Sequence, residues 1–226
     1  MSDIQKNLPL QGEAKSSTAD NLLFIAIKYK NAIIGALVLI VCLGAGTFFW
    51  MRQQQSSEQE AALQLSRVAP LFDQGDYKAA INGKGQIAGL KKIADEHRGS
   101  PSGNMAALLL ANAYYSVSEY DSALQVFKTV STGNNDLAAA ALAGTGACYS
   151  NKNQFAQAAE SYQEASKKAE NSVLKSQYLA HAADCFQQLK QLKKASELYT
   201  KIIADYPGST GAAMAQRALW QISGQL

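Results

Sequence analysis

The sequence predicts an all-α protein in which a single N-terminal transmembrane helix is followed by a solenoid of helix hairpins. Two observations carry this prediction. A run of 20 residues without charge, Ala32 to Met51, is long enough to cross a bilayer as one helix. Further along, a small residue followed four residues later by an aromatic recurs at Ala123, Ala158 and Ala195.

The spacing of these small residues indicates repeated helix hairpins. They lie 35 and 37 residues apart, and each also follows an aromatic by nine residues. A period near 34 residues is typical of two-helix repeats, which must stack because one hairpin cannot bury its apolar face alone. The aromatics after the small residues are Phe127, Tyr162 and Tyr199, and those before them are Tyr114, Tyr149 and Phe186.

The repeated segment resembles the tetratricopeptide repeat (TPR) family. The third repeat ends in Asp205-Tyr206-Pro207-Gly208, with the proline where the family usually places it. Thr145 and Ala182 depart from the family pattern, because leucine is usual there, and the family's early tryptophan is absent. The resemblance implies a TPR-like fold and binding of proteins or extended peptides. Further positions that match are Leu110, Ala111, Tyr114, Gly146 and Tyr149.

The composition is that of a globular protein, with 47% hydrophobic and 17% charged residues and a formal charge of +3. This balance, without a basic run, argues against a nucleic-acid partner. The three cysteines form no CxxC motif, so neither a zinc site nor a thioredoxin-like pair is indicated. We therefore expect no metal, cofactor or small-molecule substrate.

Five segments follow one another along the chain. Residues 1–30 form a short tail, expected to be disordered up to residue 21 and to end in an interfacial segment at 22–30. The transmembrane helix takes 31–51, and a helical stalk with a degenerate leading repeat takes 52–103. Three TPR-like repeats fill 104–209, and a helix over 210–226 caps the open end of the array.

The charges beside the apolar run give a direction for the span. Lys15, Lys28 and Lys30 precede it, whereas Arg52 and Arg67 follow it, so the positive-inside rule favours a cytoplasmic N-terminus and repeats on the outer side. A buried globular helix and a cleaved signal peptide are the alternatives for this run. No A-x-A cleavage site follows it.

The leading repeat is interrupted where its second helix should continue. Ala80 is its small anchor, but glycines at 83 and 85 should stop that helix early. A further helix is expected over 87–97. The segment Gly83-Lys84-Gly85 fails as a phosphate loop because no serine or threonine follows Lys84.

Few residues suggest catalysis. His181 lies three residues before Asp184, but no nucleophile is suggested beside them, so groove-lining roles are favoured. Cys148 and Cys185 occupy equivalent repeat positions, on helices expected about 8–10 Å apart. That is beyond the reach of a disulfide, so both are interpreted as buried fillers. Catalytic residues are therefore expected to be absent.

In TPR proteins the first helices of successive hairpins line a concave groove. The family's carboxylate clamp needs lysine and arginine there, and only Asn112 fits that clamp. The middle of the predicted groove is small and apolar, suited to a peptide backbone, although alanine and glycine there could instead serve tight helix packing. The resemblance assigns these groove residues: Met105, Leu108, Leu109, Asn112, Tyr115, Ala143, Gly144, Ala147, Gln177, His181 and Asp184.

The order of tail, apolar helix, stalk and repeats is similar to the YfgM-type family of ancillary subunits of the bacterial SecYEG translocon. This resemblance implies an inner-membrane protein with periplasmic repeats that helps the translocon or newly exported proteins. A structural scaffold in an envelope assembly or division complex is the alternative. Small residues of the apolar helix, at Gly35, Cys42 and Gly46, could dock against another membrane helix.

Overall fold

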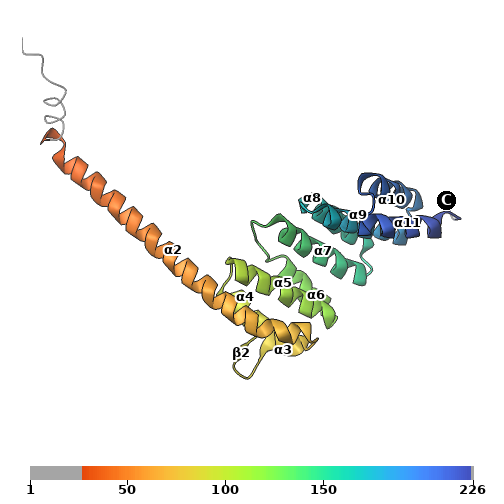
Figure 1. The fold of residues 1–226 in the computed structure, drawn as a ribbon, viewed down its shortest axis with the longest axis horizontal. Helices are drawn as coiled ribbons and strands as arrows, with labels where there is room; N and C mark the ends of the chain where they lie inside the picture. The colour runs from red at the N-terminus through yellow and green to blue at the C-terminus, as the bar shows by residue number, and fades with distance from the viewer. Residues whose placement is uncertain (1–26, 225–226) are drawn as a thin grey trace, which may run out of the picture. The chain divides into compact units, whose positions relative to one another are not determined.

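The computed structural model describes residues 27–224, and nearly all of this part is helical (Figure 1). The chain divides into two compact units, Met1–Gln53 and Gln54–Leu226. The predicted disordered tail at 1–21, and the interfacial segment at 22–30 up to residue 26, lie outside the described residues. All-helical architecture with repeated hairpins is therefore confirmed for the part that is described.

The longest helix among the described residues is α2 (Lys30–Asp73). The predicted transmembrane helix and the predicted stalk are thus one continuous helix. Among the described residues, no helix is long and apolar enough to cross a membrane. The predicted span at 31–51 is therefore not confirmed.

Helix hairpins follow one another through the second unit, and Figure 1 shows them from α5 to α11. Each long helix contacts the next along the chain, and the first helix of each hairpin also contacts the first helix of the following hairpin. The pairs are α5 (Pro101–Ser116) with α6 (Tyr120–Phe127), α7 (Asn135–Asn151) with α8 (Phe155–Lys168), and α9 (Ser172–Gln188) with α10 (Leu192–Asp205), followed by α11 (Thr210–Ile222).

The helices that open a hairpin share one N-terminal signal. Ser100, Asn134, Asn171 and Ser209 precede them, and each side chain accepts a hydrogen bond from a backbone N–H in the first turn. Such caps satisfy donors that a helix N-terminus leaves without partners. The second helices have no side-chain cap. Helix α11, which was predicted to cap the array, has the same kind of N-cap as the opening helices.

The turn inside every hairpin has, at the same position, a residue whose backbone is in the left-handed conformation. Ser118, Asn153 and Lys190 have φ of 64°, 58° and 61°, and Gly75 takes the same place in the leading repeat with φ of 78°. The backbone N–H of the next residue bonds back to the carbonyl five residues earlier, at 2.9 Å in all four turns. This pairing ends a helix with its carbonyls satisfied and reverses the chain.

The predicted anchors of the repeats are buried. Ala123, Ala158 and Ala195 are fully buried, because each lies where two helices touch. The aromatics four residues later are at most 8% exposed. A fully buried small residue allows close helix approach, and the aromatic then fills the space between hairpins. The repeat register read from the sequence is confirmed.

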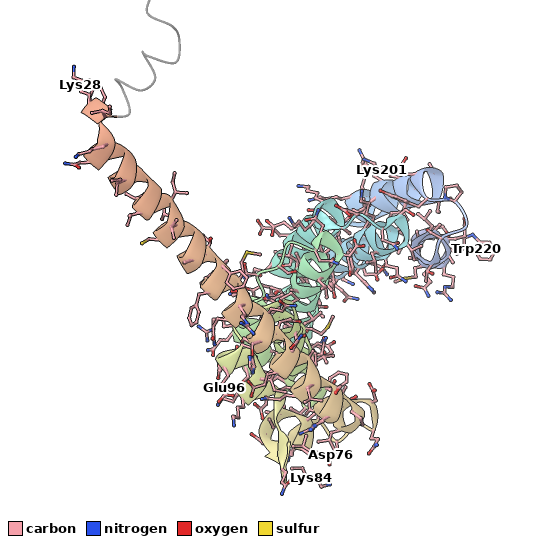
Figure 2. All side chains as sticks on the ribbon, turned by 60° about the vertical axis from the view of Figure 1, so that its left-hand side comes forward. Lys28, Asp76, Lys84, Glu96, Lys201 and Trp220 are labelled. Atoms are coloured by element: carbon pink, nitrogen blue, oxygen red, sulfur yellow. The ribbon has the colours of Figure 1, made fainter. Side chains whose placement is uncertain are left out.

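The leading repeat departs from a plain helix hairpin. After α3 (Tyr77–Asn82) the chain forms two short antiparallel strands, β1 (Gly83–Lys84) and β2 (Ile87–Ala88), and then α4 (Leu90–Glu96). Gly83 has φ of 88° and stops α3, as predicted. The strand pair was not predicted, and it shortens the helix expected over 87–97. Figure 2 shows Lys84 at this tip. Its Nζ lies 3.5 Å from Asp76 Oδ2.

A polar cluster ties the second half of α2 to the N-terminus of α5. The Glu58 carboxylate accepts hydrogen bonds from the Ser102 backbone N–H at 3.0 Å and from the Ser102 hydroxyl at 2.5 Å. Burial alone would raise the pKa of Glu58, but the bonds from Ser102 and Ser100 lower it overall. His97 is only 7% exposed, and its Nδ1 lies 3.0 Å from the Ser57 hydroxyl. This histidine is therefore a packed residue of the α2–α4 contact.

Candidate functional site

The predicted groove residues all lie on the helices that open the three repeats. Met105, Leu108, Leu109, Asn112 and Tyr115 are on α5; Ala143, Gly144 and Ala147 are on α7; Gln177, His181 and Asp184 are on α9. Helices α5, α7 and α9 contact one another in order. Their shared surface is called the first-helix face below. The structure brings only part of the predicted set to this face.

Gly144 does not face an open groove. A Cβ added at this glycine would overlap ring atoms of Phe127 on α6, the second helix of the preceding hairpin. Gly144 therefore lets two hairpins approach, and the prediction that it leaves room for a ligand backbone is wrong. Of the two alternatives left open for these small residues, tight packing holds at this position.

His181 repeats the arrangement of Gly144 one hairpin later, since it follows Gly144 by 37 residues. Its ring lies against Tyr162 of α8, with 5.2 Å between ring centroids and a tilt of 34°. Tyr162 is the equivalent of Phe127 in the second repeat. Leu109 is the equivalent of Gly144 in the first repeat, and it packs with the core of the leading repeat. This helix position is an inter-hairpin contact.

The apolar centre of the predicted groove is mostly interior. Leu108 is 8% exposed and packs with α6 and α7 residues, and Ala143 is 9% exposed in the core of the last two repeats. A ligand could reach little of either side chain. The remaining predicted residues are half-buried at the surface: Met105, Asn112, Tyr115, Ala147, Gln177 and Asp184.

A polar pocket of about 420 Å³ lies between α7 and α9, where the two helices end. His181 and Asp184 line it, so this part of the prediction coincides with a real hollow. Most of its lining comes from residues that sequence reasoning missed, and these are Ser150, Asn151, Asn153, Phe155, Tyr162, Cys185 and Gln188. Asn151 and Gln188 could have been found, because both are the last residues of first helices, 37 apart.

Hydrogen bonds extend from this pocket toward the first repeat. Asn151 donates through Nδ2 to the Tyr115 hydroxyl at 2.8 Å and to the Ala147 carbonyl at 3.0 Å. Tyr120 donates to Asn151 Oδ1 at 3.4 Å, and its ring meets Tyr115 edge-on with 5.5 Å between centroids. Lys152 pairs with Asp121 beside them. These contacts fix the neighbouring hairpins to each other at one edge of the first-helix face.

Asp184 is held in place from behind by α10. The Tyr199 hydroxyl donates to Asp184 Oδ1 at 2.5 Å, and His181 Nδ1 lies 3.7 Å from Oδ2. Burial of the Tyr199 ring, together with this bond to a carboxylate, raises the pKa of Tyr199, so its hydroxyl stays a donor at neutral pH. The carboxylate keeps a fixed orientation, and about half of the Asp184 side chain, 47%, is still exposed.

The cysteines at equivalent repeat positions are both buried free thiols. Cys148 is fully buried and Cys185 is 3% exposed, and neither forms a disulfide. The prediction of buried fillers is confirmed for both. Burial raises the pKa of each thiol to about 11, which makes them poor nucleophiles at neutral pH. Among the described residues no cluster of His, Cys, Asp and Glu could hold a metal ion.

One family model matches the chain. Its description is tetratricopeptide repeat-like domain, and it covers residues 27–145, which is 119 of 226 residues. The match begins before the three predicted repeats, includes α2, the leading repeat, α5 and α6, and ends inside α7. No curated protein matches the chain. Because the matched segment is more than half of the sequence, the chain belongs to the family of tetratricopeptide repeat-like domains.

Proposed function

We propose that this chain is a non-catalytic binding protein whose first-helix face receives an extended segment of a protein partner. TPR-like domains are protein-interaction modules in general, and the family membership supports this class of function. The observation that carries the proposal is the polar pocket between α7 and α9, which is lined by amide and hydroxyl side chains among others. An extended peptide presents unpaired N–H and C=O groups that such side chains can satisfy.

Several amides are placed for this task on successive helices. Asn112 on α5, Gln177 on α9 and Gln188 at the end of α9 are at least partly exposed. Asn151 is already oriented by its bonds with Tyr115, Ala147 and Tyr120, so its Oδ1 can accept from a peptide N–H at little cost in rotamer freedom. An amide both donates and accepts, which matches the alternating groups of a peptide backbone.

We further propose that residues 31–51 anchor the chain in the bacterial inner membrane, with the repeats in the periplasm. The support is the run from Ala32 to Met51, which has no charged residue. The described side chains of this part of α2 are exposed, among them Phe49 at 72% and Trp50 at 65%. Exposed apolar side chains of this size need a nonpolar surrounding.

Within that placement, the favoured role is a helper of the Sec translocon or of newly exported proteins, as the architectural resemblance implies. A scaffold in an envelope assembly or division complex is the second candidate. The two differ in what the first-helix face contacts in cells. A helper contacts a translocon subunit and many exported chains, whereas a scaffold contacts a fixed set of envelope proteins.

Site-specific photocrosslinking in cells tests the proposed function. A photoreactive residue replaces Gln188 in the pocket, and a matched control replaces Lys201 on the outward side of α10 (Figure 2). Both positions are exposed, so neither replacement disturbs the core. We expect protein crosslinks from position 188 and not from 201, with mass spectrometry distinguishing helper from scaffold. Equal crosslinking from both positions would refute a working first-helix face.

A further inference from the structure

We propose that the pocket between α7 and α9 is a subsite for a basic side chain, lysine or arginine, of the bound peptide. This inference rests on the proposed function and names the ligand chemistry of its pocket. Asp184 is the one acidic residue among the nine described residues that line this hollow, and no lysine or arginine lines it. The pocket therefore combines one carboxylate with one histidine, His181, and with polar and aromatic side chains.

The carboxylate is prepared to accept a cation. Tyr199 donates to Oδ1 from the buried side, which fixes the direction of the carboxylate group. Oδ2 is 3.7 Å from His181 Nδ1, longer than a hydrogen bond, and 47% of the side chain is exposed. A guanidinium or ammonium group can thus bind Asp184 without breaking its bond from Tyr199, and a fixed acceptor costs little entropy on binding.

The other lining groups suit the same ligand. Ser150, Asn153 and Gln188 offer neutral oxygens that can accept from the remaining N–H groups of a guanidinium or ammonium ion. Phe155 supplies an apolar wall for the aliphatic stem of lysine or arginine. The nearest lysine along the chain, Lys152, pairs with Asp121 and does not line the pocket.

The same composition disfavours an acidic ligand. A peptide carboxylate in this pocket would meet Asp184 with no lysine or arginine to compensate it. The peptide carboxylate and the Asp184 carboxylate would repel each other, and the repulsion is stronger where water is partly excluded. The subsite therefore selects by charge, and a basic residue at one peptide position is the expected signature.

Selection from a random peptide display library against the full-length chain tests this inference. We expect the enriched peptides to share a lysine or arginine at one position. A synthetic peptide with that residue replaced by glutamine should then bind roughly tenfold more weakly, the usual worth of a charge-assisted hydrogen bond. This comparison needs no change in the protein, so it stands even if a pocket variant folds poorly.

Variants of the protein complete the cycle. Asp184→Asn keeps an oxygen for Tyr199, so it should fold normally while losing the preference for the basic peptide over its glutamine version. Asp205→Asn, on an exposed carboxylate at the end of α10, is the matched control and should keep that preference.

The outcomes distinguish failure of the cation subsite from failure of the proposed function. Enriched peptides without a shared basic residue would overturn the cation subsite and leave the peptide-binding face standing. An Asp184→Asn protein that keeps the full preference would also overturn the subsite. A library that yields no binder overturns the subsite together with the proposed function.

Discussion

Replacing Gly144 by alanine should destabilise the protein, although the same change in an ordinary helix stabilises it. Glycine inside a helix costs about 1 kcal/mol relative to alanine, so propensity alone predicts a gain. Here the new methyl carbon would lie only 2.2 Å from the nearest atom of the Phe127 ring, so this buried ring would have to shift. Overpacking of this kind costs about 1–3 kcal/mol, so we expect a net loss of up to about 2 kcal/mol.

A double-mutant cycle isolates the cause. Phe127→Leu removes the ring atoms that the new methyl group would meet, so Gly144→Ala should be neutral or stabilising in that background. The coupling free energy between the two sites should be about 1–3 kcal/mol, as for residues in direct contact. Gly146→Ala on the same helix is the control. A Cβ there lies 3.1 Å from the Tyr162 ring, so only a small shift is needed.

Urea unfolding of the full chain, followed by far-ultraviolet circular dichroism, gives the required free energies of unfolding. The midpoint for Gly144→Ala should fall below that of the parent, and the Phe127→Leu background should remove this difference. If Gly144→Ala instead raises the midpoint equally in both backgrounds, the assigned contact between α7 and α6 does not exist.

Three further outcomes are expected. Lys190→Gly should raise the free energy of unfolding by about 1 kcal/mol, because glycine tolerates the left-handed φ of 61°. Asn153→Gly should change the free energy of unfolding little, because asparagine already tolerates a left-handed φ. Equal shifts of the two variants in thermal melts would contradict this. The lowered pKa of Glu58 means that its contribution to stability is present above the ordinary value of 4.5 and is lost as the pH falls through the folded-state value. Glu58→Gln should therefore be less stable than the parent near neutral pH, with the difference shrinking in acid unfolding curves; a difference independent of pH would exclude the charged bond. Cys148 and Cys185 are buried, so a thiol reagent should modify them only as fast as the repeats open. In the folded state their pKa of about 11 also leaves roughly one thiolate in a thousand at pH 8. Modification of these two thiols within the mixing time would show them to be accessible.

The hairpin positions could be predicted from the sequence because their signals are local and repeated. A small residue is needed wherever two helices touch, and an aromatic is needed to fill the next gap. Ala158 and Tyr162 meet both needs within one turn of helix, and both are buried. The same pair of residue types recurs at the equivalent positions of the other repeats, so the repeat boundaries can be assigned by comparing the three repeats.

The groove could be predicted only in part, because adjacent helix residues point about 100° apart. Ala143 and Gly144 therefore cannot both face the same narrow groove. The sequence alone does not fix which of two neighbours faces the preceding hairpin, since that depends on the rotation of α7 against α6. The overlap of an added Cβ at Gly144 with Phe127 settles this rotation.

Two other features have weak sequence signals. The strands β1 and β2 have two residues each, too short for any alternating pattern. The short α6 has eight residues against 14 in α8 and α10, and its early end leaves a hollow of about 550 Å³ beside α7 and α8. The aromatic spacing that defines the repeats is complete at Phe127, the last residue of α6, so it carries no information about the missing turns.

Hydrogen–deuterium exchange of the full chain, with and without a peptide enriched from the display library, tests the central claim most directly. If the first-helix face receives the peptide, backbone amides at the C-terminal ends of α7 and α9 should exchange more slowly when it is bound. The outward helices α8 and α10 should change little. Protection confined to α8 and α10, or to α2, would contradict the account.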